Sequence, residues 1–69
     1  MEGNVYKFIE LVGTSDQSWE KAAANAIETA SKTLRDLRIA EVLELDMQIE
    51  EGKISAYRTK VKLSFKIDN

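Results

Sequence analysis

The side chains of this chain that could do chemistry are carboxylates and arginines, because histidine and cysteine are both absent. The usual general base, nucleophile and zinc ligands are therefore missing, which argues against an enzyme and against a zinc site. Glu41 falls among the apolar positions of its segment, where burial would raise its pKa. One such carboxylate is weak support for catalysis, and a buried salt bridge with Arg35, Arg38 or Arg58 is the alternative. We expect a protein that is not an enzyme.

Two arginines, Arg38 and Arg58, form the first candidate binding site, for a small anion or a phosphate group. The planar guanidinium fork matches both kinds of ligand. Structural ion pairs are nevertheless commoner than ligand sites. Pairing with Glu41, with Glu44 or with a carboxylate of a neighbouring subunit is therefore the favoured explanation for these arginines.

Acidic side chains near the middle of the chain form the second candidate site, for calcium. Glu44, Asp46 and Glu50 recur on one face of a predicted strand, and Glu51 follows in a turn. Calcium takes roughly six to eight oxygen ligands, so symmetry-related copies of the chain would have to share the ion. The favoured alternative is a solvated strand whose carboxylates face lysines across a hairpin. No EF-hand loop is present.

Other features weigh against further partners. Trp19, at the start of a predicted helix, is expected in a core or an interface and not on a ligand. The lysine row of residues 60, 62 and 66 could attract nucleic acid, but the net charge of −2 and the acidic neighbouring strand oppose this. No apolar run approaches the length of a membrane span and no signal-peptide pattern opens the chain. We expect a cytoplasmic protein without nucleic-acid or membrane partners.

Four segments must position these side chains, in the order β-α-β-β. Residues 4–12 (NVYKFIELV) are rich in β-branched and aromatic types and predict a strand. An alanine-rich apolar stripe with helical spacing predicts a helix from about Asp16 or Ser18 to Asp36. Residues 38–50 and 54–67 alternate as strands, and Gly52 marks the turn of a hairpin between them. The prediction is an α+β fold, with a three-stranded antiparallel sheet wrapped around one helix.

The size of the chain predicts association with other copies. Its 69 residues allow one domain, spanning residues 1–69, and a domain this short buries only about 60% of its unfolded surface. Disulfides are excluded, and the alanine stripe buries little area. The first strand is apolar on both faces, with Val5, Ile9 and Leu11 on one side. Tyr6, Phe8 and Val12 lie on the other, which we expect to pack on a partner.

The chain resembles the dodecin family over nearly its whole length. The resemblance rests on residues 10–15 (ELVGTS), the alanine-rich helix after them, residues 40–42 (AEV) and the strand 57–65 (YRTKVKLSF). It implies a β-α-β-β subunit assembled as a hollow homododecamer around a central cavity. Members of this family bind flavins in pairs near a symmetry axis and act as cofactor stores or buffers.

Two positions depart from the flavin-binding members that the chain resembles. Ile39 stands where they keep a tryptophan that stacks on the flavin, and an aliphatic side chain cannot supply stacking worth about 0.5–1.5 kcal/mol beyond area burial. Arg58 replaces a glutamine that hydrogen-bonds the ring, and arginine has no acceptor. Arg38 and Glu41 flank Ile39, so an arginine-filled pocket is expected there.

The resemblance leaves the ligand open. A calcium-binding branch of the family also lacks the tryptophan and shares residues 18–20 (SWE). We therefore expect a dodecin-like storage shell with weakened or lost flavin binding, whose ligand is a metal ion or a small anion. The alternative is a true flavin-binding dodecin, sequestering riboflavin or FMN in a pocket rebuilt around arginine. A third hypothesis is a structural oligomer without a ligand.

Overall fold

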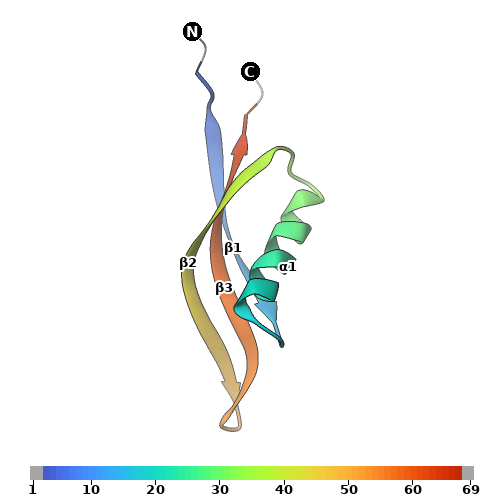
Figure 1. Cartoon of the computed structure of the whole chain (residues 1–69), viewed down its shortest axis with the longest axis vertical. Coiled ribbons are helices and arrows are strands. Elements are labelled where there is room, and N and C mark those ends of the chain that lie inside the picture. Colours follow the sequence, from blue (N-terminus) through green and yellow to red (C-terminus); the bar gives the residue numbers. More distant parts are fainter. Residues whose placement is uncertain (1–2, 68–69) are drawn as a thin grey trace.

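The computed structural model describes residues 3–67 and contains the predicted β-α-β-β order (Figure 1). The elements are β1 (Tyr6–Ser15), α1 (Trp19–Ser31), β2 (Leu37–Glu50) and β3 (Lys53–Lys66). The strands form one antiparallel sheet with the order β1-β3-β2. This confirms the predicted fold class. No helix within these residues is long and apolar enough to cross a membrane.

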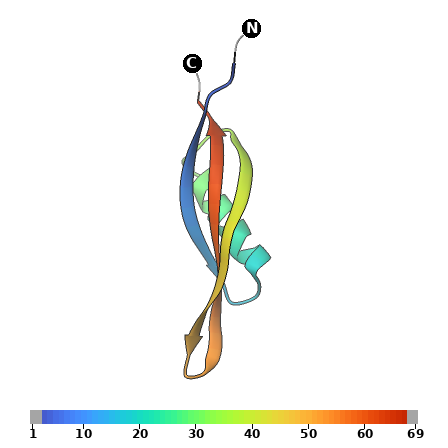
Figure 2. The same cartoon turned by 90° about the vertical axis from the view of Figure 1, so that its left-hand side faces the viewer.

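The helix covers only one face of the sheet. Figure 2 shows α1 behind the three strands, while no helix or strand of residues 3–67 lies on the other face. The β2–β3 hairpin also extends well past the start of α1 (Figure 1). At its tip, Glu51 and Gly52 both have positive φ, of 50° and 75°, which is the backbone of a type I′ turn. The turn expected at Gly52 is thus confirmed, and a large part of the sheet has no helix over it.

Strand β1 is longer than predicted because it runs through Gly13 to Ser15. The predicted strand ended at residue 12, but Gly13 pairs with Thr59 and lies directly beneath α1. A Cβ at this position would overlap the carbonyl oxygen of Ala22, so the glycine allows the helix to approach the sheet. The helix itself begins after Ser18, whose side chain accepts a 2.9 Å hydrogen bond from the Lys21 backbone N–H.

Helix α1 is shorter than predicted, since it ends at Ser31 and not at Asp36. The Leu34 backbone N–H still donates to the Ala30 carbonyl, at 2.9 Å, and the Leu34 side chain packs against the core. Asp36 then takes a left-handed backbone with φ of 57°, which aspartate tolerates better than most residues. The chain can therefore reverse into β2 without a glycine.

The core lies between the alanine stripe of α1 and the middle of β3. Ala26 and Ala30 pack on Val61 and Leu63, and all four are buried. Around them lie partly buried apolar side chains from β1, α1, the turn after α1 and the start of β2: Ile9, Leu11, Ala23, Ile27, Leu34 and Leu37. The predicted stripe is confirmed, and its small side chains make the core narrow, as expected.

Strand β2 contains bulges that its sequence did not reveal. Register shifts between Leu37 and Ile39 and between Val42 and Glu44 interrupt the predicted alternation. As a result, Glu41 pairs with Lys62 and shares the face away from α1 with Ile39. Its side chain is exposed, so the predicted burial of Glu41 is wrong. It is also absent from the three ion pairs found within residues 3–67.

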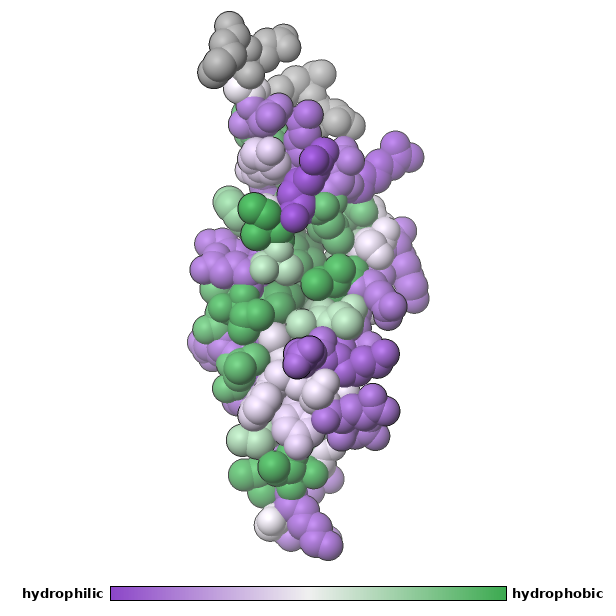
Figure 3. All heavy atoms as spheres, viewed as in Figure 1, coloured by the Kyte–Doolittle hydropathy of each residue, from purple (hydrophilic) through white to green (hydrophobic). Residues whose placement is uncertain are grey.

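Large apolar side chains remain exposed on both faces of the subunit. Phe8 and Val12 of β1 point away from α1, as predicted, and are 56% and 53% exposed. On the helix side, β2 extends beyond the cover of α1, which leaves Val42 and Leu45 exposed. Figure 3 shows apolar side chains at the surface along the middle of the molecule. Exposed apolar area of this kind marks interaction sites.

Candidate functional site

The sheet face away from α1 carries almost all the candidate site residues. Residues paired across antiparallel strands point to the same face, so the register sorts them into rows. Four rows run from β1 through β3 to β2: Phe8–Ser64–Ile39, Glu10–Lys62–Glu41, Val12–Lys60–Glu44 and Thr14–Arg58–Asp46. We call this surface the open face. Apolar groups dominate its first row and ion-pairing groups its last.

A cavity of about 380 Å³ lies at the apolar end of the open face. It is lined by Tyr6, Phe8, Arg38, Ile39 and Ser64. Ser64 is the smallest residue of its row and has larger neighbours on both sides, so a hollow forms above it. The bulge between Leu37 and Ile39 brings two consecutive β2 residues to this lining, which is a known use of bulges. We call this hollow the Ile39 cavity.

Within residues 3–67, the arginine of this cavity has a single, loose ion-pair partner. Arg38 Nη2 lies 4.0 Å from Asp36 Oδ1, and the two side chains are about half exposed. Pairing of Arg38 with a carboxylate was the favoured expectation, but the partner is neither Glu41 nor Glu44. A contact at this distance is weak, so the guanidinium can donate to other groups.

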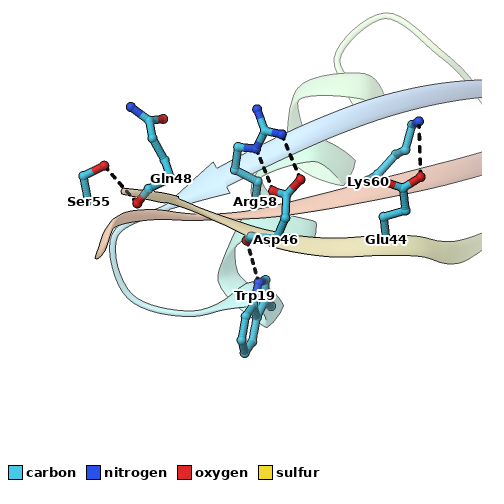
Figure 4. Close-up of polar contacts among 7 residues, drawn as sticks. All are labelled: Trp19, Glu44, Asp46, Gln48, Ser55, Arg58 and Lys60. Carbon is cyan, nitrogen blue, oxygen red and sulfur yellow. Dashed lines mark hydrogen bonds and ion pairs between the residues drawn. The ribbon is translucent and has the colours of Figure 1, made fainter. Parts of the chain in front are cut away.

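Arg58 is held by Asp46 at the opposite end of the open face (Figure 4). Its Nε and Nη2 donate to the two carboxylate oxygens at 2.7 and 2.8 Å. The hydrogen bond from Arg58 lowers the pKa of Asp46 from its ordinary value. Arg58 is thus engaged in an ion pair, as favoured, but its partner is Asp46, a residue of the candidate calcium site, and not Glu41 or Glu44. Because Arg58 is six residues from Ser64 along β3, it lies about 20 Å from the Ile39 cavity.

The candidate calcium ligands do not converge within one chain. Glu44 lies 3.9 Å from the Lys60 ammonium, and Glu50 accepts a 3.0 Å hydrogen bond from the Gln48 amide. No group of three or more acidic side chains that could hold a metal ion occurs in the described part of the chain. The Glu44–Lys60 contact confirms the predicted pairing of acids and lysines across the hairpin.

Trp19 lies on the helix side of the sheet, opposite the Asp46 side chain (Figure 4). Its indole N–H donates to the Asp46 carbonyl oxygen at 2.9 Å, and its ring meets Tyr57 edge-on with centroids 5.1 Å apart. The Thr59 hydroxyl donates to the Trp19 carbonyl at 2.8 Å. These contacts fasten the start of α1 to β2 and β3, which agrees with the structural role expected for Trp19.

Sequence reasoning missed three residues of the Ile39 cavity. Tyr6 and Phe8 were placed on a partner-facing side of β1, and Ser64 was not among the candidate site residues. These three residues come together only through the register of the strands. The only local sequence signal was Ser64, a small residue between larger ones. A second hollow of about 380 Å³ lies between α1 and β1, lined by Leu11, Val12, Gly13, Thr14, Asn25, Ala26 and Thr29. No sequence signal pointed to it.

Comparison with known proteins identifies the relatives of this fold. The sequence model of the dodecin family matches residues 5–68. The chain belongs to the dodecin family. Among curated dodecins, calcium dodecin from Mycobacterium tuberculosis is 44% identical over 64 residues, which cover 93% of this chain and 90% of the relative. Dodecin from Thermus thermophilus is 39% identical over 66 residues, covering 96% of each.

Solved dodecin structures superpose on nearly the whole chain. A dodecin from Streptomyces coelicolor has a TM-score of 0.93 at 36% identity and covers 100% of this chain and 99% of that one. The crystal structure of the M. tuberculosis calcium dodecin, described as calcium chelating with a novel calcium-binding site, has a TM-score of 0.83 at 48% identity. That match covers 93% of this chain and 91% of the other. The chain is thus a dodecin-like binding protein.

Proposed function

We propose that this chain assembles into a hollow shell of twelve copies, binds a small ligand at the Ile39 cavity, and has lost strong flavin binding. The observation that carries the proposal is Ile39 itself. It is 68% exposed on the wall of a cavity, at the position where the flavin-binding relatives it resembles keep a stacking tryptophan. The proposed role is binding and storage, with no catalytic step.

The exposed apolar surface supports self-assembly. A single copy leaves Phe8 and Val12 open on one face and Val42 and Leu45 open on the other, each more than half exposed. A narrow alanine core beneath them makes an isolated subunit marginal. Closed symmetric assembly would cover both faces at once, and it is the commonest form of soluble oligomer.

The chemistry of the two family positions, Ile39 in the cavity and Arg58 at the other end of the open face, supports the loss of flavin. An isoleucine offers a flavin ring dispersion contacts without a π face, which forgoes roughly 0.5–1.5 kcal/mol of stacking per subunit. Arg58, at the family's glutamine position, has no acceptor and is already engaged by both oxygens of Asp46. Ile39 and Arg58 therefore provide the flavin ring with neither the stacking of a tryptophan nor the hydrogen bond of a glutamine.

Calcium is the second candidate ligand, because of the similarity to calcium dodecin. Glu44, Asp46 and Glu50 lie too far apart within one chain to complete a site, so copies would have to share the ion. Asp46 would also have to leave Arg58. These requirements make calcium the less favoured candidate.

A riboflavin titration tests the loss of flavin binding. Quenching of riboflavin fluorescence should be weak for the native protein and clearly stronger for Ile39→Trp combined with Arg58→Gln. Ile39→Val, which stays aliphatic, serves as the matched control and should behave like the native protein. Tight binding by the native protein would support the alternative of a pocket rebuilt around arginine. No gain in the double variant would contradict the assignment of these two positions.

A thermal shift tests calcium. If the ion is bound, calcium should raise the melting temperature, a chelator should reverse the rise, and Glu44→Gln should abolish it. Glu20→Gln, an exposed carboxylate on α1, is the matched control. An unchanged melting temperature would exclude calcium as the ligand and leave the Ile39 cavity as the candidate site.

A further inference from the structure

Ser64 is the polar group at the floor of the Ile39 cavity. It is only 5% exposed, yet it lines the cavity between Phe8 and Ile39. Its hydroxyl makes no hydrogen bond to any group within residues 3–67, although buried polar groups are normally partnered. Among the described residues, no side-chain nitrogen or oxygen atom is both fully buried and without a hydrogen-bond partner. The Ser64 hydroxyl oxygen, which has no partner there, must therefore keep some exposure. Its hydrogen-bonding capacity is therefore open to the cavity.

Arg38 supplies a second donor at the same hollow. The bulge before Ile39 places its side chain on the lining, and its contact with Asp36 is loose, at 4.0 Å. A guanidinium has only donors, and a serine hydroxyl can turn to donate as well. Two donors that converge on one cavity match an anionic oxygen group such as a carboxylate or phosphate.

The other walls of the cavity are apolar. Tyr6 and Phe8 contribute aromatic rings, and Ile39 contributes a branched aliphatic chain. Aromatic side chains favour ring partners in edge-on or offset contact. A volume of about 380 Å³ is within the range of small-molecule sites. An inorganic ion alone would leave these walls without a partner.

From this arrangement we propose that the Ile39 cavity binds a small amphipathic anion. Its charged oxygens lie on Arg38 and Ser64, and its apolar, preferably aromatic body lies among Tyr6, Phe8 and Ile39. The inference rests on the proposed function in taking this cavity as the ligand site, and it adds the chemical class of the ligand.

Two lysines of the open face lie beside the cavity. The Lys62 ammonium lies 4.9 Å from the centroid of the Phe8 ring, and Lys66 pairs with Tyr6 across the strands. Glu10 and Glu41 stand in the next row with Lys62 between them. Because the lysine reaches over Phe8, its charge is directed toward the cavity, while the two carboxylates flank it on the outer strands.

Calorimetry with three matched probes tests the proposal on the assembled protein. Phenylacetate combines a ring with a carboxylate, 2-phenylethanol keeps the ring without the charge, and acetate keeps the charge without the ring. Phenylacetate should bind on the order of tenfold more tightly than either, as expected for a charge-assisted hydrogen bond added to apolar contact. Raising the salt concentration should weaken the binding of phenylacetate and leave the binding of 2-phenylethanol unchanged.

Two variants assign the binding to the named side chains. Arg38→Gln should weaken the binding of phenylacetate on the order of tenfold and that of 2-phenylethanol hardly at all. Ser64→Ala should weaken the binding of phenylacetate several-fold. Arg35→Gln removes the same charge from an exposed residue outside the cavity lining, and it should bind like the native protein. The oligomeric mass of each variant is measured first, and the comparison of probes on native protein does not depend on any variant.

Three outcomes would overturn the proposal. One is equal binding of phenylacetate and 2-phenylethanol, and another is unchanged phenylacetate binding in an assembled Arg38→Gln variant. The third is no binding of any probe, which would mean that a second copy of the chain fills the cavity. If the native mass is that of a monomer or dimer, the proposed shell fails separately, so the two failures are distinguishable.

Discussion

Gly13 lies where α1 approaches β1 too closely for a side chain, and its replacement by alanine gives a sharp prediction. The new Cβ would overlap the carbonyl oxygen of Ala22 and stand 2.9 Å from its carbonyl carbon and 3.0 Å from the Ala26 Cβ. Real Cβ atoms essentially never approach other heavy atoms within 3.0 Å, so something must move.

The atoms that must move belong to the backbone of the first turns of α1. The Ala22 N–H donates to the Ser18 carbonyl at 3.0 Å, and the Ser18 side chain caps the Lys21 N–H. The first turn of α1 therefore cannot shift without breaking these hydrogen bonds or moving the whole helix. Overpacking costs about 1–3 kcal/mol, and a clash with backbone belongs at the upper end. We expect Gly13→Ala to lower the free energy of unfolding by about 3 kcal/mol, or the melting temperature by about 12–24 °C.

Denaturation followed by circular dichroism at one fixed chain concentration measures this loss. The concentration is fixed because the stability of an oligomer depends on it. Gly3→Ala is the matched control, because a Cβ there meets nothing within 4 Å, and it should unfold like the native protein. A Gly13→Ala variant within about 0.5 kcal/mol of native stability would refute the close packing of α1 on β1.

Three further substitutions test other parts of the subunit. Ser18→Ala removes the cap of the Lys21 N–H and should cost about 1 kcal/mol in chemical denaturation, whereas a loss near zero would contradict the capping role. Leu63→Ala empties the core at a residue that is 1% exposed and should cost about 2–5 kcal/mol in the same assay, unless another copy refills the space. The hydrogen bond from Arg58 lowers the pKa of Asp46, so the pair stabilises the fold above the ordinary carboxyl pKa of 3.8. That stability is lost as the pH falls through the folded value, and an acid titration of Asp46→Asn should show a shallower loss than the native protein.

The sequence was sufficient for features set by local periodicity. The alanine stripe, the hairpin turn at Gly52 and the two-sided first strand all depend on residues within a few positions of each other, and all three are present. The helix end was misplaced because the stripe continues to Leu34, which reaches the core from a turn and not from a helix.

Features set by long-range register were not predictable. The bulges in β2 move Glu41 to the open face, and no local signal distinguishes a bulged strand from a regular one. The Ile39 cavity also depends on register, because Phe8, Ser64 and Ile39 meet only when three strands align. Family resemblance pointed to Ile39, but the buried hydroxyl beside it required the structure.

The native mass of the purified protein tests the central claim most directly. Light scattering coupled to size-exclusion chromatography should give about 94 kDa, twelve times the chain mass of 7.8 kDa. Such a shell would cover the apolar surface that a single subunit exposes on both faces. A mass near that of one or two chains would contradict the assembly and, with it, the account of why this surface is exposed.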